Sequence, residues 1–238
     1  MDDKEQWYRM SGKEAAAALK IDISAGLEPG EAADRLREYG ANELEALPGR
    51  SIYSMLLDQF KEVMVLMLIA AAIISGLVGE VKDSIIILLI VLLNAILGVV
   101  QENKAENALA ALKKLSAPVA TVIRGGKPQQ IPARELVPGD VIVLEAGTNI
   151  PADARLLEVA NLRCEEAALT GESVPVEKTI TPLESQDVGI GDLVNMVFSG
   201  TTAVYGRGKA LVVGTGMQTE IGKIAKLYHR NRLHYSLN

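Results

Sequence analysis

Two long apolar runs dominate the pattern of hydrophobic and polar positions along the chain. Val63 to Gly79 and Ser84 to Gln101 contain no charged residue, and only Glu80 to Asp83 separate them. Each run approaches the ~20 residues that a helix needs to cross a hydrocarbon layer of about 30 Å. We expect a transmembrane helical hairpin over residues 49–103, with spans at about 60–79 and 84–102. The alternative, a buried hairpin in a soluble core, is disfavoured because neither run has a polar face.

Positive charges flank the hairpin on the side of its two outer ends. The turn holds one cation, Lys82, whereas the flanking segments hold Arg50, Lys61, Lys104, Lys113 and Lys114. Cytoplasmic loops carry an excess of Lys and Arg, so the pattern places both termini in the cytoplasm. We therefore expect an integral protein of the plasma membrane with two spans, for which the lipid bilayer is a partner.

The polar segments on either side of the hairpin have helical patterns. Ser11 followed by Glu14 predicts a capping box at the start of one helix. A second helix is bounded by Pro29 near its start and by Gly40 at its end. These helices, within residues 1–48, are expected to pack on the domain that follows the hairpin. After the second apolar run, "ENKAENALAALKKL" predicts that the helix continues beyond the membrane, up to Pro118.

Beyond Pro118 the pattern changes to short strands separated by Gly, Pro and Asp. "VATVIRGGKPQQI" predicts a β-hairpin with Gly125 and Gly126 at its turn. Further strands are expected in "VPGDVIVLEAG", "NIPADARLLEV", "NMVFSGTTAV" and "GKALVVGTG", before a final helix in "TEIGKIAKLY" that is capped near Thr219. The predicted fold class is therefore membrane α + β, in which a mostly antiparallel β domain accompanies the helical hairpin.

Composition and charge exclude several classes of protein. The chain has 238 residues, 49% of them hydrophobic, and a formal net charge of −6, which argues against a nucleic-acid partner. Its one cysteine, Cys164, rules out an internal disulfide. The two histidines, His229 and His234, add too little for a zinc cluster. We predict no metal site and no cofactor site in this chain.

The segment "CEEAALTGESVPVEK", from Cys164 to Lys178, has no obvious structural purpose. It places acidic residues and a Thr-Gly-Glu-Ser run between two short apolar pieces. Thr-Gly-Glu-Ser alone is ordinary turn chemistry, and Glu172 would then be only a turn residue. Glu165 and Glu166 are interpreted as solvated charges. The turns that end in Asp140 and Asp153 are interpreted as fixing strand geometry, with contact to another domain as the alternative.

Several stretches together carry a resemblance to a known family. "LTGES" follows a membrane hairpin at a fitting distance, and the remaining stretches are "YGANEL", "NAILGVVQENKAENALAALKKL", "LVPGDVIVLEAGTNIPADARLL" and "FSGTTAVYGRGKALVVGTGMQTEIGKIA". Over residues 19–226 the chain resembles the amino-terminal part of P-type cation-transporting ATPases, particularly the calcium-pump branch. The resemblance implies that residues 104–227 form the actuator domain, with a distorted jelly-roll-like sheet.

The resemblance also implies a role for the loop. Members of the family transfer a phosphoryl group from ATP to an aspartate and then hydrolyse the aspartyl phosphate. Glu172 would position and activate the attacking water, since general-base assistance of this kind contributes roughly 10²–10⁴-fold. Gly171 would let the backbone approach the phosphate, and Thr170 and Ser173 would hold the loop by local hydrogen bonds. The catalytic candidates are therefore Glu172, Thr170, Gly171 and Ser173.

Other features of the family do not occur in these residues. The sequence contains no Asp-Lys-Thr-Gly-Thr run, in which the family's phosphorylated aspartate lies. ATP and magnesium are therefore implied only for a complete enzyme, and the chain by itself is expected to be inactive. Its partners would be the phosphorylation and nucleotide-binding domains and the transported cation, calcium by resemblance. Residues 228–238 are expected to form an atypical, foreign or frameshifted tail that is disordered.

Two hypotheses from different classes remain open. In the first, the chain is the amino-terminal part of an ATP-driven calcium pump and supplies the Thr-Gly-Glu-Ser loop. In the second, it is a stand-alone, non-catalytic membrane protein that keeps the actuator fold in order to bind or regulate an intact pump.

Overall fold

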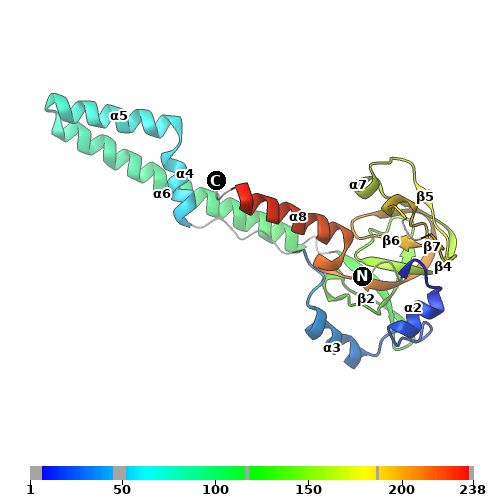
Figure 1. Cartoon of the computed structure of the whole chain (residues 1–238). Helices are drawn as coiled ribbons and strands as arrows, with labels where there is room; N and C mark the ends of the chain where they lie inside the picture. Colours follow the sequence, from blue (N-terminus) through cyan, green and yellow to red (C-terminus); the bar gives the residue numbers. More distant parts are fainter. Residues whose placement is uncertain (1–6, 45–51, 116–117, 186–187, 236–238) are drawn as a thin grey trace. The chain divides into compact units, whose positions relative to one another are not determined.

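The chain divides into two compact units in the computed structural model, which describes residues 7–44, 52–115, 118–185 and 188–235. One unit is helical and comprises residues 46–117. The other combines residues 1–45 with residues 118–238 and contains the sheet (Figure 1). Residues from both sides of the hairpin therefore fold into one unit, which the order of the elements along the chain does not show.

The helical unit is a hairpin of α5 (Val63–Val78) and α6 (Val81–Leu115), preceded by α4 (Ile52–Phe60). The predicted tight turn is confirmed, because Gly79 ends α5 in the left-handed conformation with φ 98°. The Ser84 hydroxyl donates to the Ala72 carbonyl oxygen at 2.8 Å and ties the two helices together beside the turn. The second helix continues to Leu115 as predicted, whereas α4 is an element that the sequence pattern did not indicate.

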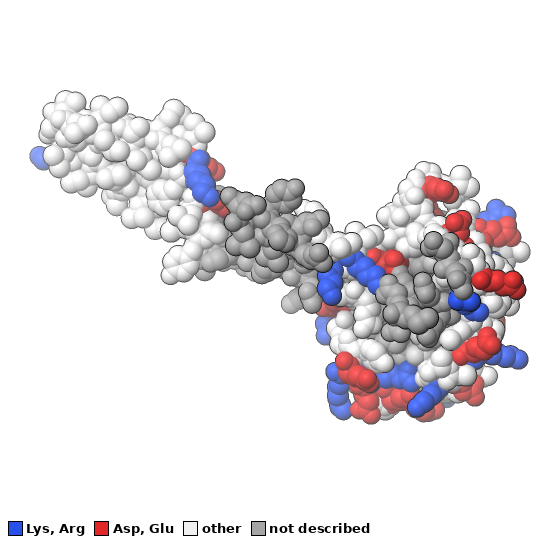
Figure 2. Space-filling model, in the orientation of Figure 1, with Lys and Arg blue, Asp and Glu red and all other residues white. Residues whose placement is uncertain are grey.

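Most of the surface of α5 and of the first turns of α6 is apolar. The most exposed side chains of the hairpin include Leu77, 83% exposed, and Val78, 73% exposed. On the face shown in Figure 2, the part formed by α5 and the first turns of α6 is almost free of charged residues, whereas the β unit displays both signs. Residues 81–108 of α6 are long and apolar enough to cross a membrane. The pair of α4 and α5, bent by 67°, would be a second crossing if it acts as one span.

The β unit is built on an antiparallel sheet, which confirms the predicted domain type. The order of the main strands is β2-β1-β3-β7-β4-β5, and β6 pairs with β4 at the side of this path. The strands are β1 (Val119–Arg124), β2 (Lys127–Pro132), β3 (Val141–Glu145), β4 (Asp153–Glu165), β5 (Val176–Glu177), β6 (Met196–Val197) and β7 (Thr202–Gly214).

Short helical turns and helices complete this unit. The 3₁₀ turns are η1 (Ala133–Glu135), η2 (Ile190–Asp192) and η3 (Gly216–Gln218). The α-helices are α2 (Gly12–Ala18), α3 (Pro29–Tyr39), α7 (Ala167–Thr170) and α8 (Glu220–Tyr235). The capping box of Ser11 and Glu14 is present at the start of α2, and Gly40 ends α3, as predicted. The Thr219 hydroxyl caps α8 by accepting from the Gly222 amide at 3.0 Å.

Two local predictions were wrong. "NMVFSGTTAV" is not one strand, because β6 ends at Val197 and Gly200, with φ 78°, turns the chain before β7. A Cβ at Gly200 would also lie 2.3 Å from the Ile221 Cδ1 atom, so the turn packs tightly against α8. The segment expected to be a disordered tail continues α8 as far as Tyr235.

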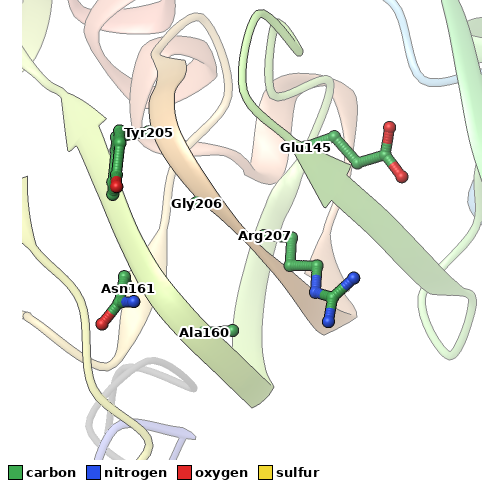
Figure 3. A pocket seen from close by; sticks show the side chains of 6 residues that line it. All are labelled: Glu145, Ala160, Asn161, Tyr205, Gly206 and Arg207. Atoms are coloured by element: carbon green, nitrogen blue, oxygen red, sulfur yellow. The ribbon is translucent and has the colours of Figure 1, made fainter.

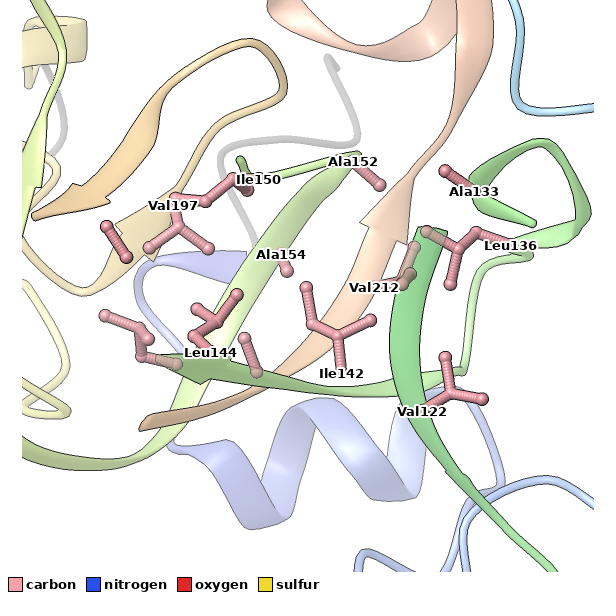
Figure 4. Close-up of a cluster of buried hydrophobic side chains, with 14 of the residues drawn as sticks. Val122, Ala133, Leu136, Ile142, Leu144, Ile150, Ala152, Ala154, Val197 and Val212 are labelled. Carbon is pink, nitrogen blue, oxygen red and sulfur yellow. The ribbon is translucent and has the colours of Figure 1, made fainter. Parts of the chain in front are cut away.

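Both faces of the sheet are buried, which explains why neighbouring strand residues are apolar. The main core, drawn in Figure 4, lies on one face and includes Ile142, Leu144 and Val212. On the opposite face, Val141 and Leu211 pack against the small side chains of α2, Ala15 and Ala16. Successive strand residues point to opposite faces, and α2 covers the face opposite the main core, so it is an integral layer of the β unit.

One buried cation ties the amino-terminal segment to the sheet. Arg155 of β4 is fully buried, and its guanidinium donates at 2.7–3.1 Å to the carbonyl oxygens of Trp7, Met10, Leu156, Ile180 and Asn195. Burial lowers the pKa of Arg155 to about 10, so the side chain is still charged at neutral pH. Carbonyl dipoles from four separate segments of the chain therefore solvate this charge in place of water.

Replacing Arg155 by leucine tests this contact. In Arg155→Leu the five carbonyl oxygens lose the guanidinium, although those of Trp7 and Asn195 still accept from the amides of Met10 and Leu156. Each buried polar group that is left without a partner costs about 1–3 kcal/mol. We expect the free energy of unfolding to fall by roughly 3 kcal/mol or more. Urea unfolding of the chain in detergent micelles, followed by the fluorescence of the single tryptophan, measures it.

The matched control is Arg207→Leu, which removes an exposed arginine from β7. We expect a change within about 0.5 kcal/mol for this variant. Equal stability of the two variants would show that Arg155 does not anchor the amino-terminal segment.

Candidate functional site

The Thr-Gly-Glu-Ser segment forms an exposed loop between β4 and β5. The single-turn helix α7 ends where Gly171, with φ 76°, takes the left-handed conformation and donates its amide to the Ala167 carbonyl oxygen at 2.9 Å. Residues 171–175 are all exposed. Apart from its two neighbours in the chain, no described residue has a heavy atom within 4 Å of a Cβ placed at Gly171, so the backbone at this point is open to approach from outside.

Thr170 fixes the local geometry through its hydroxyl group. The hydroxyl donates to the Glu166 carbonyl oxygen at 3.1 Å and accepts from the Glu172 amide at 3.2 Å. One side chain thus connects the last turn of α7 to the residue after Gly171. The structure brings Thr170, Gly171, Glu172 and Ser173 together in this loop, with the Glu172 and Ser173 side chains exposed.

Glu166 is not a solvated charge, and that prediction was wrong. Its side chain is 1% exposed and forms an ion pair with Lys178, whose side chain is fully buried, at 2.5 Å between Oε1 and Nζ. Burial raises the pKa of Glu166, and the charge of Lys178 opposes this shift. Glu165, its neighbour, is exposed as predicted. Sequence reasoning missed the pair because Glu166 and Lys178 meet only when β5 folds back on β4.

The surroundings of the ion pair are mostly apolar. Cys164 is fully buried close to the pair, and burial raises the pKa of its thiol to about 12. The Lys178 Nζ lies 5.8 Å from the centre of the Phe198 ring. The alternation of Leu162 and Cys164, both buried, would have placed Glu166 on the same inward face. That period of two was the signal in the sequence that Glu166 is buried.

The two aspartates of the turns are structural within this unit. Asp140 is fully buried and accepts from the Arg124 guanidinium at 2.7 and 2.8 Å and from the Val137 amide at 3.0 Å. Asp153 accepts from the amides of Ser199 and Glu220 at 2.9 and 2.8 Å. Both carboxylates therefore hold turns against strands, which supports the interpretation that they fix strand geometry.

A pocket of about 500 Å³ lies on the β unit but does not include the loop. Figure 3 shows its lining from β3, β4 and β7, namely Glu145, Ala160, Asn161, Tyr205, Gly206 and Arg207. None of the four candidate catalytic residues contributes to it. Across the described ranges, no group of three or more His, Cys, Asp or Glu residues is arranged to hold a metal ion.

Comparison with known proteins identifies relatives of both units. A family model of the P-type ATPase actuator domain matches residues 114–229, and a model of the cation transporter/ATPase N-terminus matches residues 7–75. The chain is 49% identical over 220 residues to a calcium-transporting ATPase of Listeria monocytogenes, covering 92% of this chain and 25% of that protein.

Two Bacillus proteins are similar over nearly the same share of this chain. A calcium-transporting ATPase of Bacillus cereus is 46% identical over 227 residues, covering 94% of this chain and 26% of the relative. One of Bacillus subtilis is 43% identical over 222 residues, covering 93% and 25%. The chain thus spans about a quarter of the length of these relatives.

The bridging role of Thr170 can be tested directly. Thr170→Val keeps the shape of the side chain but removes both hydrogen bonds of the hydroxyl. A bond of this kind contributes about 1 kcal/mol, so we expect the Glu172 amide to exchange its hydrogen about fivefold faster. Hydrogen-exchange mass spectrometry of the full chain in lipid nanodiscs, on peptides that cover residues 168–174, measures this rate.

Thr179→Val is the control. The Thr179 hydroxyl accepts from the amide two residues later, that of Thr181, at 3.2 Å, as the Thr170 hydroxyl does from Glu172. This variant should leave exchange in residues 168–174 unchanged. An unaltered Glu172 amide in Thr170→Val would show that the hydroxyl does not hold the loop.

Proposed function

Because the chain belongs to the P-type cation-transporting ATPase family, with that family's amino-terminal region and actuator domain, we propose that it supplies the loop that dephosphorylates the aspartyl-phosphate intermediate of a cation pump. The observation that carries the proposal is the exposed carboxylate of Glu172, directly after a glycine whose backbone is open to approach. The acyl phosphate would be presented by a phosphorylation domain, which is not among these residues.

The chemistry needs a water molecule in line with the phosphorus and a group to take its proton. A carboxylate on a protruding loop can accept a hydrogen bond from that water and then its proton, while the P–O bond to the aspartate breaks. The open space at Gly171 would let the loop backbone lie against the phosphate oxygens. Thr170 would set the direction of Glu172 through the bond to its amide, and Ser173 would complete the loop.

A transport cycle requires that this carboxylate reach the phosphoenzyme only at one stage, and a separate unit can provide that. If Glu172 were always beside the phosphoenzyme, the acyl phosphate would be hydrolysed before the ion had moved. The loop belongs to a compact unit distinct from the membrane hairpin, so the unit can approach or leave the phosphorylation site as a whole. By this mechanism the chain alone neither hydrolyses ATP nor moves an ion, because its aspartyl phosphate comes from another domain.

The cargo and the membrane topology belong to the same proposal. Three relatives are named as calcium transporters, and we take calcium as the cargo of the complete pump. Residues 81–108 would form one span and the bent pair of α4 and α5 the other, with the turn at Lys82 outside and both outer ends in the cytoplasm. The exposed aliphatic side chains of the hairpin would then contact lipid.

Glu172→Gln tests the loop in a complete pump. Residues 1–227 replace the matching amino-terminal region of the Listeria monocytogenes relative, and the purified chimaera is phosphorylated with labelled ATP. Glutamine keeps the size of the side chain but accepts no proton. We expect the phosphoenzyme to form at its normal rate and its breakdown to slow at least about tenfold.

Glu165→Gln in the same chimaera is the matched control, because Glu165 is an exposed glutamate of the same segment. Its phosphoenzyme should break down at the unmodified rate. Normal turnover of Glu172→Gln would refute the assignment of the loop.

Labelling of introduced cysteines tests the two spans. The native Cys164 is buried and its thiol has a pKa raised to about 12, so it contributes little background. In intact cells, a membrane-impermeant maleimide should label Lys82→Cys in the turn. It should label Lys13→Cys, at an exposed position of α2, only after the membrane is opened. Labelling of both or of neither in intact cells would contradict the proposed topology.

A further inference from the structure

Two charged side chains with no part in the proposed chemistry are buried together beneath the loop. The side chain of Glu166 is 1% exposed, that of Lys178 is fully buried, and their charged atoms are 2.5 Å apart. Within the part of the chain that the structure describes, neither oxygen of Glu166 has a partner with hydrogen-bond geometry. The direct attraction between the two charges is therefore the main compensation for removing both from water.

The pair joins the two ends of the loop. Glu166 lies between β4 and α7, and Lys178 directly follows β5, so residues 167–177 form the loop between them. The backbone closes the same base, because the Lys178 amide donates to the Leu162 carbonyl oxygen at 2.9 Å and Cys164 pairs with Val176. The ion pair adds a contact between side chains at the point where the chain leaves the sheet.

The position of Glu166 determines that of α7. Its carbonyl oxygen accepts from the amides of Leu169 and Thr170 at 2.9 and 3.0 Å and from the Thr170 hydroxyl at 3.1 Å. Thr170 in turn accepts from the Glu172 amide at 3.2 Å. A chain of contacts therefore runs from Lys178 through Glu166 and Thr170 to the backbone of Glu172.

Stability alone does not account for a buried ion pair. An apolar pair of similar volume often stabilises a protein as well or better, because it avoids the desolvation of two charges. An ion pair, however, restricts the approach of its two partners more than an apolar contact does. This restriction is useful where a group must be held in one place, as the carboxylate of a water-activating loop must be.

We propose that Glu166 and Lys178 are positioning residues, whose buried ion pair closes the base of the loop 167–177 and holds Glu172 in the orientation that dephosphorylation needs. The catalytic part of this inference rests on the proposed function of Glu172. The mechanical part, that the pair holds the loop, does not.

The mechanical part is tested in the full chain. Glu166→Gln leaves Lys178 buried without a counter-charge, so the whole unit should be destabilised. Glu166→Gln/Lys178→Met removes both charges at similar volume and should restore the stability of the sheet. We expect the amides of Leu169, Thr170 and Gly171 to exchange at least tenfold faster than in the unmodified chain in both variants, in lipid nanodiscs.

The double variant separates positioning from stability. Its sheet amides, such as those of Ala154 and Leu211, should exchange as slowly as in the unmodified chain while the loop amides stay fast. Loop amides as protected as in the unmodified chain would overturn the proposal. Glu165→Gln, which removes the adjacent exposed charge, should change neither set of amides.

The catalytic part is tested in the chimaeric pump. The double variant should be phosphorylated by ATP at the normal rate, and its phosphoenzyme should break down at least tenfold more slowly. If Glu172→Gln slows breakdown but the double variant does not, the positioning role is refuted and the function of Glu172 stands. If the phosphoenzyme of Glu172→Gln breaks down at the normal rate, the proposed function fails, whatever the exchange of the loop amides shows.

Discussion

The pairing of β4 with β7 is the interaction on which the rest of the β unit depends. Both strands are 13 residues long and run antiparallel from the pair of Asp153 and Gly214 to the pair of Glu165 and Thr202. Asp153, at the start of β4, holds the first turn of α8. Arg155, two residues later, anchors the amino-terminal segment. The other end of β4 leads into the Thr-Gly-Glu-Ser loop, so one strand contacts the amino-terminal segment, α8 and the base of the loop.

The pairing of β4 with β7 is irregular at several places along the two strands. The register shifts between Ala160 and Arg163, and Asn161 takes a left-handed conformation with φ 52°. A Cβ at Gly206, opposite, would lie 2.2 Å from the Asn161 carbonyl oxygen, so only glycine fits there. Bulges of this kind bend a strand and change the direction of the residues after the bulge. The bend directs the end of β4 toward β5 and thus sets the base of the loop.

The charged residues of the β unit discussed above differ in exposure. The carboxylate proposed to act on water, Glu172, is exposed, whereas Arg155, Asp140, Glu166 and Lys178 are buried, each with partners that compensate its charge. In the proposed mechanism, exposure would keep the carboxylate of Glu172 available to another domain, and the buried charges would fix the backbone that carries it. The hairpin of α5 and the first turns of α6 follows a third pattern, in which aliphatic side chains cover most of the described surface.

The sequence by itself determined the features that depend on local order. These are the two apolar helices, the capping box, the β-hairpin at Gly125 and the antiparallel β domain. Tertiary structure alone decided that α2 forms a layer of the sheet, that Arg155 is solvated by carbonyl groups of distant segments, and that Glu166 pairs with Lys178. Each of these contacts joins residues from different segments of the chain. The alternation along β4 could indicate that Glu166 is buried, but only the folded chain shows which residue compensates its charge.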